Sequence, residues 1–171
     1  TKATGMLARL AHDLEIEATR FEARVEVDGE RWKAELVVPI AALRVVGVLR
    51  KGRVDRSVLS ASDHEELRKR LDEQVFPGGD ALEIEAQGAS RQRGTVTVRW
   101  RGAGQTLPLQ QRVVERGAGE GEVSGRVALS LKALGIKEIK APLGAFKVHD
   151  AVEVLYTMIL QPRPGGTGSG P

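Results

Sequence analysis

Apolar and polar residues alternate with period two through several short segments of this chain, and this pattern constrains the fold more than any other feature. It is clear in FEARVEV (21–27), ALEIEAQ (81–87), TVTVRWR (95–101) and AVEVLYTMIL (151–160). Successive side chains of a strand point to opposite faces, so each segment predicts a strand with one apolar and one polar face. The pattern favours a mainly β protein, built as an antiparallel barrel or a sandwich.

Turn residues separate the alternating segments. Asp28-Gly29 tolerates positive φ and stands between two alternating runs, which predicts a hairpin of 21–27 with 32–38. The run RGAGQ (101–105) predicts a second tight turn, and most of the 20 glycines fall between strands in the same way.

One segment departs from period two and predicts a single inserted α-helix over about residues 62–75. Leu67, Leu71 and Val75 recur four residues apart, which is the spacing of one helical face. Ser62 followed by Glu65 matches a capping box at the start, and Pro77-Gly78-Gly79 ends the helix.

The length of 171 residues fits one domain, expected over residues 1–160. Residues 161–171 (QPRPGGTGSGP) have no apolar anchors, so we expect a flexible tail there. No apolar run approaches the ~20 residues of a membrane-spanning helix. The chain has no cysteine, which excludes disulfides and thiolate chemistry, and its net charge of +3 is too mild to indicate nucleic-acid binding.

Three His-Asp neighbours invite a catalytic or metal interpretation: His12-Asp13, Asp63-His64 and His149-Asp150. Adjacent side chains of a strand point to opposite faces, so these pairs favour hydrogen-bonded scaffold residues over a metal centre. No nucleophile elbow is present, and GVLRKGR (47–53) lacks the Lys-Ser/Thr end of a phosphate loop. We therefore expect no catalytic residues, no metal and no cofactor.

The apolar strand faces are the remaining candidates for function. They carry mostly Val, Leu, Ile and Ala with little aromatic bulk, so a barrel built from them can enclose a long apolar cavity or fill its interior with side chains. The first alternative predicts a binding site for a hydrophobic small molecule; the second predicts a packed protein-interaction or scaffold module. The expected ligand-binding residues are Leu36, Val38, Leu82, Ile84, Val96, Val98, Trp100, Leu129, Val154, Tyr156 and Met158.

A second candidate is the run of cations between residues 44 and 56. Arg44, Arg50, Lys51 and Arg53 are expected to form a basic loop that either is simply solvated or holds an anionic head group.

The order of these segments resembles the YceI-like family. The resemblance covers about residues 4–160 and rests on AHDL (11–14), IAALRVVG (40–47), the inserted helix and the stretch from Leu143 to Asp150, LGAFKVHD. It implies a lipocalin-like antiparallel β-barrel that holds a polyisoprenoid chain, such as a quinone tail, and no catalytic residue.

This chain departs from the family pattern at its beginning. Family members usually have a further strand ahead of the glycine, whereas only TKAT precedes Gly5 here. Exposed strand edges near a shortened first strand predict a possible homodimer. Starts of the AHDL type resemble those of relatives without an export signal, which favours the cytoplasm, or the periplasm if a signal has been removed.

Overall fold

We analysed a computed structural model of the chain, which describes residues 13–117, 119–137 and 150–161. Seven antiparallel strands form the main sheet in the order β10-β9-β8-β7-β6-β3-β2. These strands are β2 (Glu22–Asp28), β3 (Arg31–Pro39), β6 (Ala81–Ser90), β7 (Arg93–Trp100), β8 (Ala103–Gly117), β9 (Glu120–Ser130) and β10 (Ala151–Leu160).

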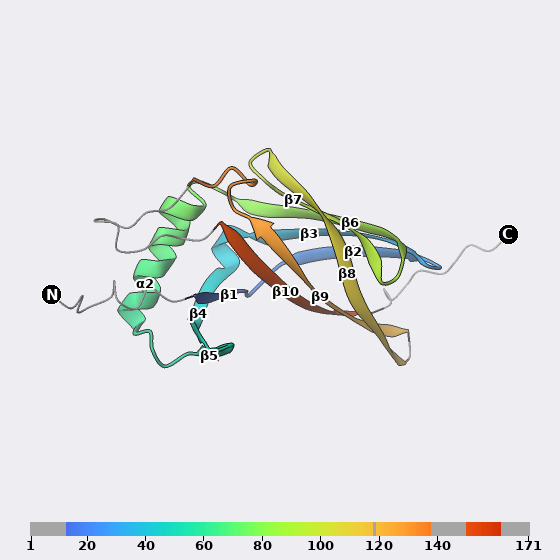
Figure 1. Cartoon of the computed structure of the whole chain (residues 1–171), viewed down its shortest axis with the longest axis horizontal. Helices are drawn as coiled ribbons and strands as arrows, with labels where there is room; N and C mark the ends of the chain where they lie inside the picture. The colour runs from blue at the N-terminus through green and yellow to red at the C-terminus, as the bar shows by residue number, and fades with distance from the viewer. Residues whose placement is uncertain (1–12, 118, 138–149, 162–171) are drawn as a thin grey trace.

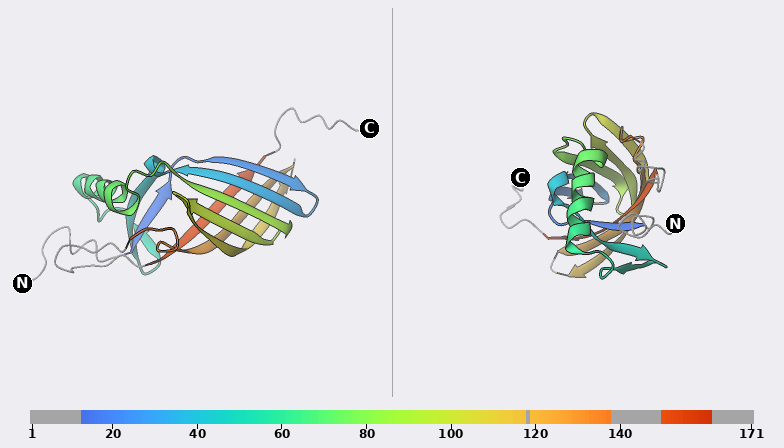
Figure 2. Two further views of the ribbon diagram at one scale, coloured as in Figure 1. Left: turned by 90° about the horizontal axis from the view of Figure 1, so that it is seen from above. Right: turned by 90° about the vertical axis from the view of Figure 1, so that its left-hand side faces the viewer.

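The main sheet curls into half a barrel (Figures 1 and 2). Its two outermost strands, β2 and β10, do not pair with each other in the described part of the chain. The mainly β, lipocalin-like architecture with one helix is thus confirmed, with an open side where the sheet ends. The strand expected at 151–160 coincides with β10.

A second, three-stranded sheet has the order β1-β4-β5, with β1 (Leu14–Ala18), β4 (Leu43–Arg50) and β5 (Arg53–Asp55). The short 3-10 helix η1 (Ile40–Ala42) carries the chain from β3 into β4. This sheet lies at the end of the half-barrel near the helix (Figure 1).

The turns follow the predicted chemistry. The hairpin at Asp28-Gly29 is confirmed, since Asp28 pairs with Arg31 and Gly29 has φ 58°. Arg101 and Gly102 have φ 49° and 83°, the two consecutive positive values that a type I′ turn between β7 and β8 requires.

The helix α2 (Ala61–Arg70) continues as a π-helical segment, η2 (Leu71–Val75). Its predicted cap was wrong. Ser60, not Ser62, is the N-cap: the Ser60 hydroxyl accepts the Asp63 N–H, and the Asp63 carboxylate accepts the Ser60 N–H at 2.8 Å. Two serines two residues apart each precede an acidic residue by three, and Ser60 has the extended backbone, φ −78° and ψ 170°, that an N-cap needs.

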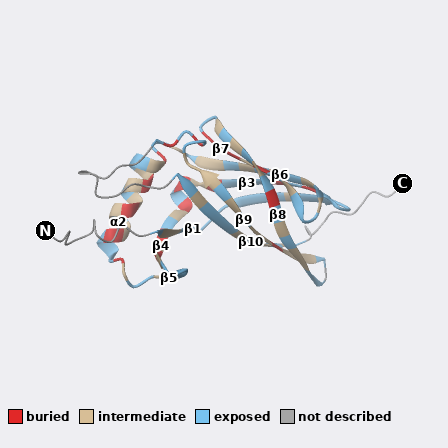
Figure 3. Cartoon of the chain, viewed as in Figure 1, coloured by how far each residue is buried: buried red, intermediate tan, exposed pale blue. Residues whose placement is uncertain are grey.

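Buried side chains gather where α2 meets the end of the half-barrel (Figure 3). Leu67 and Leu71 of the predicted helical stripe are 5 % and 7 % exposed there. They belong to the same cluster as Val48 of β4 and Leu134, which follows β9. The helix therefore closes this end of the barrel.

Candidate functional site

The predicted ligand-binding residues lie on one face of the main sheet, which we call the inner face. The register shows this, because directly paired residues share a face. Leu36 pairs with Ile84, and Ile84 pairs with Val98. Toward the β10 end of the strand order, Tyr156 pairs with Gly125 of β9, which pairs with Gln111 of β8. The inner face carries Leu36, Val38, Leu82, Ile84, Val96, Val98, Trp100, Leu129, Val154, Tyr156 and Met158.

Burial divides these residues into two groups. The first is already covered by protein: Val38, Val96, Val98 and Trp100 are each less than 9 % exposed. The second keeps free surface: Val154 is 38 % exposed, and the others are partly buried, namely Leu36, Leu82, Ile84, Leu129, Tyr156 and Met158. The structure thus brings the predicted residues to one face but leaves only the second group open to a ligand.

The chain's two tryptophans, Trp32 and Trp100, fill part of the inner face that was expected to hold little aromatic bulk. Trp32 packs over Gly88 and Gly94, where a Cβ would come within 2.5 Å and 2.8 Å of its ring. Its indole N–H donates to the Ser90 carbonyl at 2.8 Å. The Trp32 ring therefore occupies space that a cavity would need next to β6 and β7.

Trp100 closes the inner face near the helix. Its ring meets Phe76 edge-on, with 5.5 Å between centroids, and Arg101 lies over it at 5.7 Å. The Trp100 indole N–H is buried and has no acceptor among the residues that the structure describes. A Cβ at Gly79 would lie 2.4 Å from this nitrogen, so glycine allows the 77–79 turn to cross the ring closely.

Polar side chains interrupt the apolar inner face, and two of them, Tyr156 and Gln111, are hydrogen-bonded to each other. The Tyr156 hydroxyl donates to Gln111 Oε1 at 3.2 Å, and Gln111 Nε2 donates to the Arg91 carbonyl at 2.7 Å. Burial raises the pKa of the Tyr156 hydroxyl above its ordinary value of 10.0, so the group is a protonated donor at neutral pH. The alternating pattern did not predict a role for Gln111, because a single polar residue at an apolar position of a strand only weakens the pattern.

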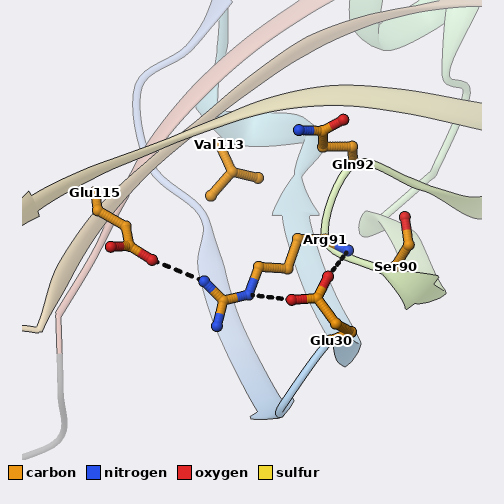
Figure 4. Close-up of a pocket in the computed structure, with 6 residues that line it drawn as sticks. All are labelled: Glu30, Ser90, Arg91, Gln92, Val113 and Glu115. Carbon is orange, nitrogen blue, oxygen red and sulfur yellow. Dashed lines mark hydrogen bonds and ion pairs between the residues drawn. The ribbon is translucent and has the colours of Figure 1, made fainter.

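A polar hollow of about 460 Å³ lies at the strand ends opposite to α2, where the β6–β7 turn meets β8 (Figure 4). Arg91 crosses it: its guanidinium contacts Glu115 at 2.8 Å and Glu30 at 3.3 Å. Val113, which pairs with Val123 on the inner face, also lines the hollow. Since both carboxylates neutralise Arg91, the hollow forms a polar rim to the inner face rather than an anion site.

The predicted basic loop is instead a hairpin of β4 and β5. Arg50 pairs with Arg53, and Lys51 with Gly52 makes the turn at φ 50° and 75°. Arg44 lies on β4 opposite Glu17, and all four predicted cations are exposed. The hairpin belongs to the three-stranded sheet, so the structure does not bring these cations together with the inner-face residues of the main sheet.

The aspartates of two His-Asp pairs act as structural hydrogen-bond acceptors. Asp63 caps α2, and Asp150 accepts the Ser130 hydroxyl at 2.9 Å and the Lys132 N–H at 2.7 Å. His12 and His149 lie outside the described residues. Within the described ranges no three His, Asp or Glu side chains gather as metal ligands, and no helix is long and apolar enough to cross a membrane.

The contacts of Asp150 predict a pH dependence. The Lys132 N–H and the Ser130 hydroxyl lower the pKa of Asp150 below its ordinary value of 3.8. A carboxylate with a lowered folded-state pKa stabilises the fold above its ordinary pKa and loses that contribution as pH falls through the folded-state pKa. We expect Asp150→Asn to lower the Tm at pH 7 and to match the parent protein at the acid end of a thermal-melt series. A difference that stays constant with pH would contradict this role.

Comparison with known proteins gives structural relatives only. No protein-family profile and no curated protein sequence matches the chain. Burkholderia cenocepacia BcnA superposes with a TM-score of 0.60 at 11% identity, over 85% of this chain and 87% of that one. A Campylobacter jejuni YceI protein superposes with a TM-score of 0.61 at 9% identity, over 88% and 86%. The chain therefore has a YceI-like fold.

Proposed function

Starting from a YceI-like fold with an apolar inner face that is only partly filled, we propose that this chain is a non-enzymatic binding protein for a long apolar ligand, such as a polyisoprenoid or an isoprenoid quinone. The observation that carries the proposal is the second group of inner-face residues. Seven side chains of one face, six of them aliphatic or thioether and one a tyrosine, keep free surface. The outer face of the sheet carries mainly Glu, Lys, Arg and Thr, and its exposed apolar side chains include Val37 on β3 and Leu155 and Ile159 on the edge strand β10.

The ligand chain would lie across this second group, from Leu36 and Ile84 on one side to Leu129, Val154 and Met158 on the other. Removing apolar surface from water contributes ~25 cal/mol per Å². A chain that covers a few hundred Å² therefore gains several kcal/mol, before ordering costs, which corresponds to a Kd of roughly micromolar. Tyr156 and Gln111 are polar partners on the same face for a ligand oxygen.

A second candidate is a packed module that binds proteins and no lipid. It is favoured by the first group of residues, because Val96, Val98 and Trp100 are already buried at 4–6 % exposure without any ligand. The two candidates differ in what they predict for the open part of the inner face: occupied by lipid in one, and bare in the other.

Tryptophan fluorescence tests the proposal, since both tryptophans of the chain belong to the inner face. Titration with a decyl-tailed benzoquinone is expected to quench the emission saturably, with a Kd of roughly micromolar. The same quinone without the tail is the control and should quench only by collision, without saturation. An unlabelled polyprenol should reverse the quenching. Equal, non-saturable quenching by both quinones would remove the proposal and favour the packed module.

A further inference from the structure

We propose that two copies of this chain associate through the free edge of β10, pairing antiparallel about a two-fold axis at Thr157. The proposal rests on the edge of the sheet and its residues, and it does not depend on whether the inner face binds lipid.

Among the residues that the structure describes, nothing pairs with the long outer edge of β10. In the described part of the chain β10 is the last strand of the main sheet, and it pairs with β9 over ten residues without a bulge. Free edges attract other chains, and proteins usually protect them with charges, proline or bulges. β10 has no Lys, Arg or Pro and one charged residue, Glu153.

The opposite edge of the same sheet shows what protection looks like. β2 has seven residues, of which Glu22, Arg24, Glu26 and Asp28 are charged and exposed. The exposed valine of β2, Val27, lies on the inner face, whereas β10 exposes apolar side chains on its outer face: Leu155 is 67% exposed and Ile159 49% exposed. The contrast indicates that β10, and not β2, is the edge that is covered.

The sequence of β10 is complementary to itself in one register. With Thr157 opposite Thr157, Leu155 meets Ile159 on the outer face, and Val154 meets Leu160 on the inner face. Tyr156 then lies opposite Met158, so each apolar side chain from 154 to 160 meets an apolar one. Shifting the axis to Tyr156 would instead place Glu153 opposite Ile159. A self-complementary edge of this kind generates a closed two-fold dimer.

The register also has a consequence for the inner face. Paired edges extend the sheet of one copy into that of the other. Tyr156, Met158 and Val154 of the two copies would then form one apolar strip across the axis, so the open side of each half-barrel is flanked by the second copy.

Cysteine cross-linking tests the register directly, because the chain has no cysteine of its own. Opposite Cα atoms of an antiparallel pair lie about 4.5–5.5 Å apart, a separation that a disulfide can span. Thr157→Cys is therefore expected to give a covalent dimer under mild oxidation. Ala128→Cys is the matched control: it is exposed on β9 and level with Glu153, so the two copies would be three strand spacings apart across the sheet, about 14 Å, and a further eight residues, about 26 Å, apart along it.

Solution mass provides the second readout. The protein, 18.5 kDa as a monomer, is expected to sediment as a dimer at micromolar concentration. Leu155→Asp should sediment as a monomer with an unchanged circular dichroism spectrum, since residue 155 is exposed in one copy. A monomeric parent protein, or cross-linking of Thr157→Cys no greater than that of Ala128→Cys, would overturn the proposal. Efficient cross-linking of Leu155→Cys instead would overturn the register.

Discussion

Val98→Asp is expected to leave the chain unfolded at 25 °C. Val98 is 4% exposed in the middle of β7, between Ile84 of β6 and Gln105 of β8. Gln105 is the polar one of these two neighbours, and a single neutral amide group does not compensate the desolvation of a buried carboxylate. Burying an unpaired ionisable group costs about 4 kcal/mol or more, which is comparable with the whole stability of a small domain, about 5–15 kcal/mol.

Val37→Asp is the matched control, since it introduces the same group on the opposite face of the sheet. Val37 is 42% exposed and lies between Glu22 and Glu83. Like charges opposite each other on a sheet cost about 0.2–1 kcal/mol, so this variant should fold. Far-ultraviolet circular dichroism with urea titration separates the two. A Val98→Asp protein that unfolds with the same midpoint as Val37→Asp would show that the inner face is not the core of the fold.

Val154→Asp is expected to weaken binding of the tailed quinone at least about tenfold while the chain stays folded. Residue 154 lies on the inner face of β10 but is 38% exposed, so its carboxylate remains hydrated in the free protein. A bound apolar chain would have to remove that hydration, and a cost of only ~1.4 kcal/mol already corresponds to a factor of ten in Kd.

Leu155→Asp separates the inner face from the strand edge. It places the same charge one residue along, on the outer face of β10. If binding depends on the inner face alone, Leu155→Asp should keep the Kd of the parent protein even where it abolishes dimerisation. Equal weakening by both variants would mean that the ligand site requires the dimer, and unchanged binding in Val154→Asp would contradict the proposed location of the ligand.

Alternation predicted the part of the fold where each strand has one buried face. The strands containing Val98, Ile84 and Tyr156 are of this kind. Which of their side chains point to the inner face could be predicted, because the alternation persists over eight to ten residues. β4 was harder to predict. Val45 pairs with Ile16 and Val48 pairs with Leu14, so these two buried valines share a face although they are three residues apart. A bulge at Val46 makes the difference, so VVGVLR has no period of two, and its flanking arginines suggested a loop instead.

The features that sequence reasoning missed depend on residues far apart in the chain. Arg91 contacts Glu30 and Glu115, which are 61 and 24 positions away, and no local pattern marks such a trio. The filling of the inner face by Trp32 depends in the same way on Gly88 and Gly94, two glycines whose spacing suggests only turns or bulges. The open side of the sheet could not be predicted locally either, because it depends on whether β2 and β10, which are far apart in the sequence, pair with each other.

Organic extraction followed by mass spectrometry tests the central claim most directly, that the inner face holds a long apolar chain. The purified protein would be incubated with a mixture of polyprenols and isoprenoid quinones, separated from free lipid by gel filtration, and extracted beside Val154→Asp as the control. The account predicts one class of isoprenoid retained at near-stoichiometric amounts by the parent protein and lost from Val154→Asp. An extract without isoprenoid, or equal traces from both proteins, would contradict it and leave the half-barrel as a packed module that binds no lipid.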